Sequence, residues 1–298
     1  KKHLTRTEAT PMATTLPTPL RTIKIVLITL STILIRHTKA LRVTPSMSVS
    51  TVASNLAEVK TKISSLTSEN KKVRLVAVSK TKPSSLILEC FKSGQVRFGE
   101  NYAQELISKA NFDTSSDVVD VELPDGIEWH FIGSLQSNKA ANLVKGVGTA
   151  LKVVETLASM KLANKLNRAV EEVRSSEENA GDYKLGVYIQ VNTSGEDSKS
   201  GVSSIEDVIS LAKDIHAQCP NLDFQGLMTI GAPGDVSCFD KLVQYRAELA
   251  QELGVDSSSL ELSMGMSGDF EEAIKRGATN VRVGSTIFGQ RDYSNVNK

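Results

Sequence analysis

Apolar residues recur along most of the chain in two alternating patterns, one with helical and one with strand character. Val52, Leu56, Val59, Ile63 and Leu66 follow one another at helical spacing with charged residues between them, which predicts an amphipathic helix. After this helix, short apolar runs rich in β-branched residues alternate with amphipathic stretches. Eight of these runs are predicted as strands, namely Val73–Ser79, Val96–Gly99, Glu128–Ile132, Thr149–Val154, Leu185–Asn192, Phe224–Ile230, Leu260–Met264 and Asn280–Gly284.

The amphipathic stretches between the runs are predicted as helices. They are Ser84–Lys92, Tyr102–Ala110, Gln136–Val144, Thr156–Val173, Ile205–Gln218, Phe239–Glu252 and Phe270–Arg276. Several runs, such as Leu75–Val78, are almost continuously apolar, which is typical of strands that are covered on both faces. Eight β/α units within about 250 residues predict an α/β fold, a single (β/α)₈ TIM barrel with an extra N-terminal helix. A doubly wound open sheet is the alternative, because eight strands alone do not exclude it.

Residues 1–46 differ in composition from the rest of the chain. They contain eight Lys or Arg residues but only one acid, Glu8, and are rich in Thr, Ser and Pro. The apolar run Ile23–Ile35 is shorter than the ~20 residues that span a bilayer. This leader is interpreted as a transit peptide or a non-native extension, with a membrane anchor as the third alternative, and is predicted to be disordered. The folded domain is predicted to cover 47–298. The predicted compartment is the cytoplasm, or a mitochondrion or plastid if the leader acts as a transit peptide.

Composition and charge exclude several classes of function. The net charge of +1 gives no electrostatic reason to expect a nucleic-acid partner. The three cysteines form no C-x-x-C pair, and the four histidines include no H-E-x-x-H motif, so no metal site is predicted. The sequence contains neither a G-x-x-x-x-G-K-[ST] loop nor a G-x-G-x-x-G loop, so a nucleotide is not an obvious ligand. No membrane partner is expected for the folded domain.

Three features at predicted strand ends indicate one kind of ligand. Lys80 follows the first apolar run, and an amine at the mouth of an apolar interior is expected to have a lowered pKa and to be nucleophilic. Ser267-Gly268-Asp269 and Gly284-Ser285-Thr286 follow the seventh and eighth runs, where many barrels bind phosphate. A lysine or a Gly/Ser turn alone is usually an ordinary surface feature. Together they favour a phosphorylated aldehyde, either a sugar phosphate in an aldolase or pyridoxal 5′-phosphate.

Seven sequence blocks in order carry a resemblance to a known family. The blocks are Val76–Pro83, Arg97–Glu105, Trp129–Lys139, Gln190–Thr193, Gly226–Met228, Leu262–Ser267 and Val281–Ser285. In these blocks the chain resembles the pyridoxal phosphate homeostasis protein family. The resemblance implies a barrel like the N-terminal domain of alanine racemase, of the kind found in fold-type III pyridoxal phosphate enzymes, with pyridoxal 5′-phosphate as cofactor.

The resemblance also implies roles for individual residues. Lys80 would hold the cofactor as a Schiff base, and Asn101 would lie beside its ring. Ser267, with the backbone of Gly284 and Ser285, would hold the phosphate. The remaining predicted site residues are Arg282, at the pyridine nitrogen, and His130 and Met264, which would line the pocket. No catalytic residue is assigned.

Arg282 favours a carrier over an enzyme. A guanidinium is always charged and cannot accept a proton, so it should leave the pyridine nitrogen unprotonated and the ring a weak electron sink. Alanine racemases add a second domain with a tyrosine base, and a chain that ends at Lys298 is expected to lack it. The predicted function is therefore homeostasis and delivery of pyridoxal 5′-phosphate by a monomer, with apo-enzymes that use this cofactor as partners. The alternative is a slow amino-acid racemase, and an aldolase is more remote.

Overall fold

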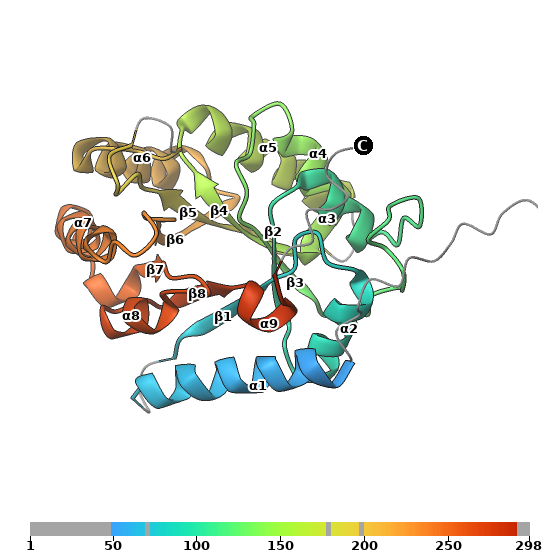
Figure 1. Cartoon of the computed structure of the whole chain (residues 1–298). Coiled ribbons are helices and arrows are strands. Elements are labelled where there is room, and N and C mark those ends of the chain that lie inside the picture. Colours follow the sequence, from blue (N-terminus) through green and yellow to red (C-terminus); the bar gives the residue numbers. More distant parts are fainter. Residues whose placement is uncertain (1–48, 69–71, 177–179, 197–199, 291–298) are drawn as a thin grey trace, which may run out of the picture. The chain divides into compact units, whose positions relative to one another are not determined.

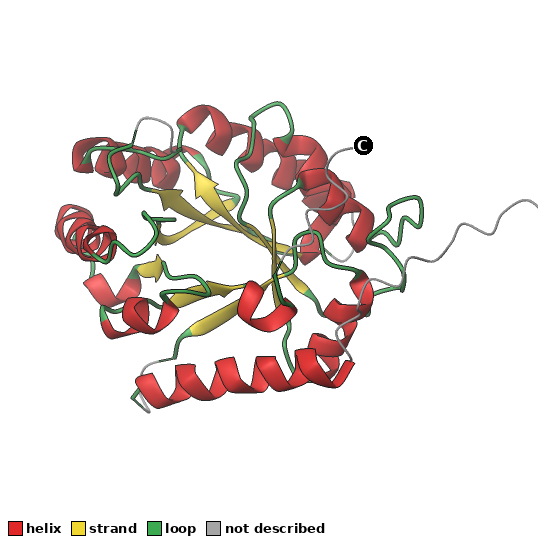
Figure 2. Cartoon of the chain, viewed as in Figure 1, coloured by secondary structure: helices red, strands yellow, loops and turns green. Residues whose placement is uncertain are grey.

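The computed structural model describes residues 49–68, 72–176, 180–196 and 200–290. In this part of the chain, strands form a closed ring and helices surround it (Figure 1, Figure 2). The prediction for the leader, residues 1–46, lies outside the described residues. Among the helices that are described, none has both the length and the apolar character needed to cross a membrane.

The barrel is built from eight parallel strands that pair in the order of the sequence. They are β1 (Arg74–Val78), β2 (Arg97–Glu100), β3 (Glu128–Phe131), β4 (Leu151–Leu157), β5 (Leu185–Gln190), β6 (Leu222–Met228), β7 (Glu261–Ser263) and β8 (Asn280–Val283). β1 pairs with β8 and closes the ring, with Val76 opposite Arg282. The predicted (β/α)₈ barrel is confirmed, and the open sheet is excluded.

Helices cover the outside of the barrel, as Figure 2 shows. They are α1 (Val49–Leu66), α2 (Ser84–Lys92), α3 (Ala103–Ala110), α4 (Ala140–Val147), α5 (Met160–Ser176), α6 (Ile205–Gln218), α7 (Ser237–Leu253), α8 (Phe270–Lys275) and α9 (Ser285–Phe288), with short 3₁₀ turns at Gly148–Ala150 and Ser257–Ser259. The main core lies between these helices and the outward face of the strands. The predicted extra helix is α1, which packs against α2, α8 and α9.

Polar contacts at the start of α1 fix its position. Glu89 of α2 accepts a hydrogen bond from the backbone N–H of Ala53 at 3.2 Å, a contact that ties α1 to α2. Asn55 Nδ2 donates to the carbonyl oxygen of Ile287 in α9, 232 residues further along the chain. The Asn55 bond joins α1 to α9, beside the predicted phosphate site.

Two helices were predicted to begin four residues too early. The fourth helix begins at Ala140 rather than Gln136. The fifth begins at Met160 rather than Thr156, because Thr156 and Leu157 still belong to β4. Thr156 Oγ1 donates to the carbonyl oxygen of Gly133 at 2.6 Å, a long-range bond that holds this residue in the extended strand. A helical pattern that starts inside a buried strand cannot be separated from it by periodicity alone.

A close backbone approach between β6 and β7 makes Gly226 sensitive to substitution. Gly226 has φ +152°, and a Cβ there would lie 2.1 Å from the carbonyl oxygen of Glu261 on the neighbouring strand. We expect Gly226→Ala to lower the free energy of unfolding by about 3 kcal/mol or more, because it combines strain with a backbone clash. The matched control is Gly254→Ala, which also has positive φ but meets no atom within 4 Å.

For Gly254→Ala the left-handed conformation alone predicts a loss of about 1 kcal/mol. Urea unfolding of the two variants beside the wild type measures both values. Equal losses in the two variants would show that the approach of β6 to β7 is unimportant.

Candidate functional site

Two adjoining cavities open at the carboxyl ends of the strands, the end of a barrel where ligands bind. The first, here called the lysine cavity, has a volume of about 280 Å³. It is lined by Val78, Lys80, Lys82, Ile132, Met266, Ser267, Gly268, Arg282, Gly284, Ser285 and Gly289. Five of the eight predicted site residues are therefore brought together in one cavity, although they come from distant parts of the sequence.

Lys80 enters this cavity because of its position after β1. Alternate residues of a strand face opposite sides, and Val78 and Lys80 face the cavity while Ser79 faces the helices. The backbone N–H of Ser79 donates to the carbonyl oxygen of Gly99 at 3.0 Å, so the pairing of β1 with β2 continues up to the residue before the lysine. The side chain of Lys80 is half-buried at the mouth of the barrel.

The opposite wall of the lysine cavity offers hydrogen-bond donors suited to an anion. Ser267 Oγ accepts from the backbone N–H of Gly284 at 3.0 Å and, more weakly, from that of Thr286 at 3.4 Å. Thr286 lies in the first turn of α9, where backbone N–H groups have no partner within the helix. Asp269 Oδ1 accepts from the backbone N–H of Met266 at 2.6 Å and holds the turn that carries Ser267.

Arg282 lies at the floor of the cavity and is almost completely buried. Its Nη1 donates to Ser263 Oγ, and its Nη2 donates to the carbonyl oxygen of Thr229 at 2.7 Å. Burial lowers the pKa of Arg282, and the carboxylate of Glu155, 3.6 Å from Nη1, opposes this shift. A guanidinium is not deprotonated in proteins, so Arg282 stays charged.

Glu155 supplies the negative charge that matches Arg282 inside the barrel. Its oxygens accept from Ser263 Oγ and from Asn280 Nδ2, and Oε1 lies 2.7 Å from His130 Nδ1. Burial alone would raise the pKa of Glu155, but the hydrogen bond and charge of His130 and the charge of Arg282 outweigh it and lower the pKa. Sequence reasoning missed Glu155, because no motif marks a single carboxylate within an apolar strand.

His130 and Met264 are not placed as predicted. Both are buried, and neither lines the lysine cavity or its neighbour. His130 faces the barrel interior, where its Nδ1 is hydrogen-bonded to Glu155 Oε1. Met264 packs into the core between the barrel and the helices. At the end of β7 the cavity is lined instead by Met266 and Ser267, which belong to the turn after the strand.

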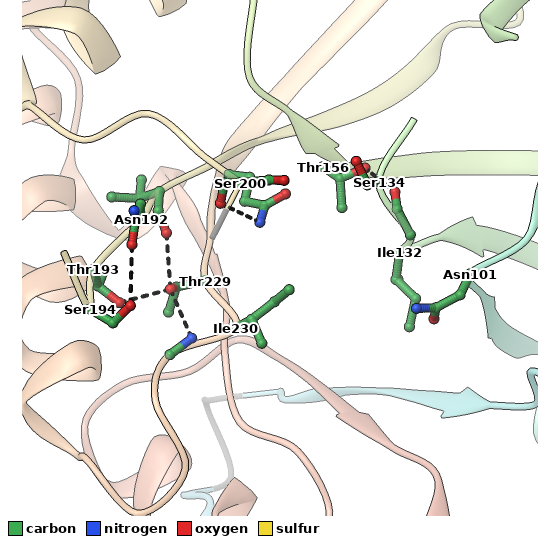
Figure 3. Close-up of a pocket in the computed structure, with 14 residues that line it drawn as sticks. Asn101, Ile132, Ser134, Thr156, Asn192, Thr193, Ser194, Ser200, Thr229 and Ile230 are labelled. Carbon is green, nitrogen blue, oxygen red and sulfur yellow. Dashed lines mark hydrogen bonds between the residues drawn. The ribbon is translucent and has the colours of Figure 1, made fainter. Parts of the chain in front are cut away.

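Asn101 lines the second cavity, which shares Ile132 with the first. This hydroxyl cavity, as it is called here, has a volume of about 260 Å³. Its other lining residues are Gly133, Ser134, Thr156, Gln190, Val191, Asn192, Thr193, Ser194, Ser200, Thr229, Ile230 and Gly231. Figure 3 shows Asn101 and Ile132 on one side and Thr193, Ser194 and Thr229 on the other. Thr193 and Thr229 are joined through their hydroxyls at 2.9 Å.

The residues present fit a phosphorylated aldehyde. The amine of Lys80 and the Ser267 turn line one cavity, so a molecule with an aldehyde and an anion can meet both. Asn101 Oδ1 is buried without a hydrogen-bond partner among the described residues, so a ligand can satisfy it with a donor. Within the same residues, no group of three or more His, Cys, Asp or Glu side chains is arranged to hold a metal ion.

Comparison with known sequences gives a consistent family. Residues 48–292 match the family model described as alanine racemase, N-terminal domain. The pyridoxal phosphate homeostasis protein of Homo sapiens is 46% identical over 227 residues, which cover 74% of this chain and 78% of the human protein. The protein of the same name from Caenorhabditis elegans is 45% identical over 231 residues, covering 76% of this chain and 88% of the relative.

Solved structures agree with the sequence comparison. PipY of Synechococcus elongatus, determined with pyridoxal phosphate bound, is 30% identical with a TM-score of 0.61, covering 80% of this chain and 100% of PipY. D-threonine aldolase from Filomicrobium marinum has a TM-score of 0.60 at 14% identity, covering 80% of this chain and 60% of the aldolase, and shares the fold alone. The chain belongs to the alanine racemase N-terminal domain family and, within it, to the pyridoxal phosphate homeostasis proteins.

Proposed function

We propose that this chain binds pyridoxal 5′-phosphate as a Schiff base on Lys80 and acts as a carrier in the homeostasis of that cofactor. The observation that carries the proposal is that Lys80, Ser267, Arg282 and Gly284 line a single cavity. When bound, the cofactor supplies an electrophilic aldehyde and a ring that can withdraw electrons. The PLP-bound PipY structure and the names of the relatives support the choice of ligand.

Ser267 and the start of α9 would hold the phosphate. The Ser267 hydroxyl and the N–H groups of Ser285 and Thr286 are neutral donors, and hydrogen bonds to an ionised acceptor are stronger than those between neutral groups. In the present structure Ser267 Oγ accepts hydrogen bonds from the N–H groups of Gly284 and Thr286. A phosphate oxygen would compete for these donors and receive the Ser267 hydroxyl hydrogen bond in addition.

Arg282 is the residue that argues against efficient catalysis. If the pyridine nitrogen of the bound cofactor met Arg282, the guanidinium could only donate a hydrogen bond to it, which would disfavour protonation of the nitrogen and weaken the ring as an electron sink. Its guanidinium is fixed by Ser263 and Thr229 and is matched in charge by Glu155. The site therefore suits storage of a reactive aldehyde better than proton abstraction from an amino acid.

Apo-enzymes that use this cofactor are the proposed recipients. Delivery requires that a second protein can reach the opening of the two cavities. Ile230 lines the hydroxyl cavity with 42% of its surface exposed, and such an apolar side chain at a rim suits a transient contact. A monomer in the cytoplasm remains the prediction for the carrier.

Lys80→Ala is expected to abolish covalent binding of pyridoxal 5′-phosphate. The substitution removes the only atom in this proposal that forms a bond with the aldehyde. Purified variants are incubated with the cofactor and reduced with borohydride, and their intact masses are measured by mass spectrometry. Lys82→Ala is the matched control, because Lys82 lines the same cavity and should leave the adduct in place. An adduct of equal yield on the Lys80→Ala variant contradicts the assignment.

Ser267→Ala is expected to weaken binding of pyridoxal 5′-phosphate by about tenfold, the loss that corresponds to one charge-assisted hydrogen bond. Binding of pyridoxal, which lacks the phosphate, should be unchanged. Titration of wild type and variant with both ligands gives four dissociation constants. Equal weakening for both ligands would place the phosphate elsewhere.

Turnover of amino acids by the loaded wild type is expected to lie at least about 100-fold below the ~10 s⁻¹ median of enzymes. The reason is the weak electron sink set by Arg282. Purified protein is assayed for racemisation of D- and L-amino acids by chiral chromatography. A rate near the enzyme median would establish the racemase alternative instead of the carrier.

A further inference from the structure

A buried group of three charged residues lies directly behind the turn that carries Lys80. The Lys109 triad consists of Lys109 and Glu105 of α3 and Glu100 at the end of β2. Lys109 Nζ donates to Glu100 Oε1 at 2.8 Å and to Glu105 Oε1 at 2.7 Å. The side chains of Lys109 and Glu100 are 0% exposed, and that of Glu105 is 11% exposed.

The Lys109 triad contacts both neighbours of Lys80. On one side, Lys109 Nζ donates to the carbonyl oxygen of Ser79 at 2.9 Å, and Ser79 Oγ donates to Glu100 Oε1 at 2.6 Å. On the other side, the backbone N–H of Thr81 donates to Glu105 Oε1 at 2.6 Å. Two hydrogen bonds with the triad therefore hold the backbone immediately before and after the lysine, and a third holds the Ser79 side chain. Hydrogen bonds to charged groups are the stronger ones in proteins.

Thr81 needs such a contact. Its φ is +61°, in the left-handed region that β-branched residues seldom adopt. A strained residue of this kind persists only where the surroundings hold it. Glu105 meets its N–H, and the conformation turns the chain sharply after β1, so that Lys80 stays at the cavity wall.

Packing alone does not account for the triad. Three charges in the helix-facing layer are unfavourable to bury, and apolar residues of similar size would fill the same space. Glu100 Oε2 is buried and has no hydrogen-bond partner within the described part of the chain. Burial, against the opposing charge of Lys109, raises the pKa of Glu100 to about 7. The triad offsets this unfavourable burial with directional hydrogen bonds to Ser79 and Thr81.

We propose that the Lys109 triad is a positioning device that fixes the Ser79-Lys80-Thr81 backbone so that the Lys80 amine meets the aldehyde of a ligand anchored at Ser267. The proposal rests on the proposed function. In the step concerned, the Lys80 nitrogen forms a double bond to the aldehyde carbon, and the aldehyde oxygen leaves as water together with the two amine protons. The triad faces the helices and not the cavity, so it acts through the backbone and does not touch the ligand.

The test separates the covalent step from anchoring. Pyridoxine 5′-phosphate carries the ring and phosphate but an alcohol in place of the aldehyde, so its dissociation constant reports anchoring alone. The rate of absorbance change at saturating pyridoxal 5′-phosphate reports Schiff-base formation. In Glu105→Ala we expect this rate to fall by about tenfold, the equivalent of one charge-assisted hydrogen bond. The dissociation constant of pyridoxine 5′-phosphate should stay within twofold of the wild-type value.

Matched variants show whether the effect belongs to the triad. Glu105→Gln keeps an oxygen for the N–H of Thr81 and should retain most of the rate. Lys109→Met should lose at least as much as Glu105→Ala. Lys145→Met is the control, because it breaks an exposed ion pair with Glu172 on the same side of the fold and should behave as wild type.

Amide hydrogen exchange of the ligand-free protein gives a readout that needs no cofactor. The peptide that contains Thr81 should exchange faster in Glu105→Ala than in wild type, while peptides of α5 should not change. If Lys109→Met does not fold, the Glu105 variants and this exchange measurement still decide the question.

Two outcomes would overturn the proposal. One is an unchanged rate together with unchanged exchange at Thr81 in Glu105→Ala. The other is an equal loss of rate and of pyridoxine 5′-phosphate affinity, which would indicate general loosening of the cavity. If the wild type itself forms no adduct on Lys80, the proposed function fails, while exchange at Thr81 still reports whether the triad holds the turn.

Discussion

The pairing of β1 with β8 is the constraint on which the site depends. It joins the two ends of the folded region, with Val76 opposite Arg282 and Ala77 opposite Val283. Because parallel strands in register end at the same level, the residues that follow them, Lys80 and Gly284, reach the same cavity. The site therefore exists only when the ring is closed, and anything that opens the pairing of β1 with β8 separates the Lys80 amine from the Ser267 turn. α1 supports the seam from outside through its contact with α9.

A second constraint is the buried charge of Arg282. An isolated guanidinium at this depth would be strongly unfavourable, so the barrel supplies Glu155, Ser263 and the carbonyl oxygen of Thr229 as partners. His130 and Asn280 satisfy the second oxygen of Glu155, which completes a network across four strands. This explains why His130 is needed inside the barrel although it does not line the cavity. Its role is to orient the carboxylate that balances the arginine.

The sequence was sufficient for the barrel and for the residues that follow strands. It could be predicted that Lys80, Ser267 and Gly284 lie at one opening, because strand ends in a closed barrel meet there and only the strand positions are needed. His130 and Met264 were predicted to line the pocket, but His130 is bonded to Glu155 inside the barrel and Met264 packs in the core. Strand positions alone do not show such tertiary contacts. The Lys109 triad was also out of reach, since the facing of Glu100 and Lys109 depends on how α3 packs on β2. Periodicity does not contain that information.

A carrier of the proposed kind must release what it binds, and the surroundings of Lys80 suit this release. A Schiff base is reversed by water, so an enzyme that must protect its intermediates excludes water from the lysine. Here Lys80 is only half-buried, and its cavity adjoins a second one rich in hydroxyl and amide side chains, which attract water. The backbone of Lys80 is held firmly by Ser79 and Thr81, while its side chain remains within reach of solvent. A firmly placed amine within reach of water favours both rapid capture and hydrolysis of an aldehyde adduct, which is the combination that the proposed delivery requires.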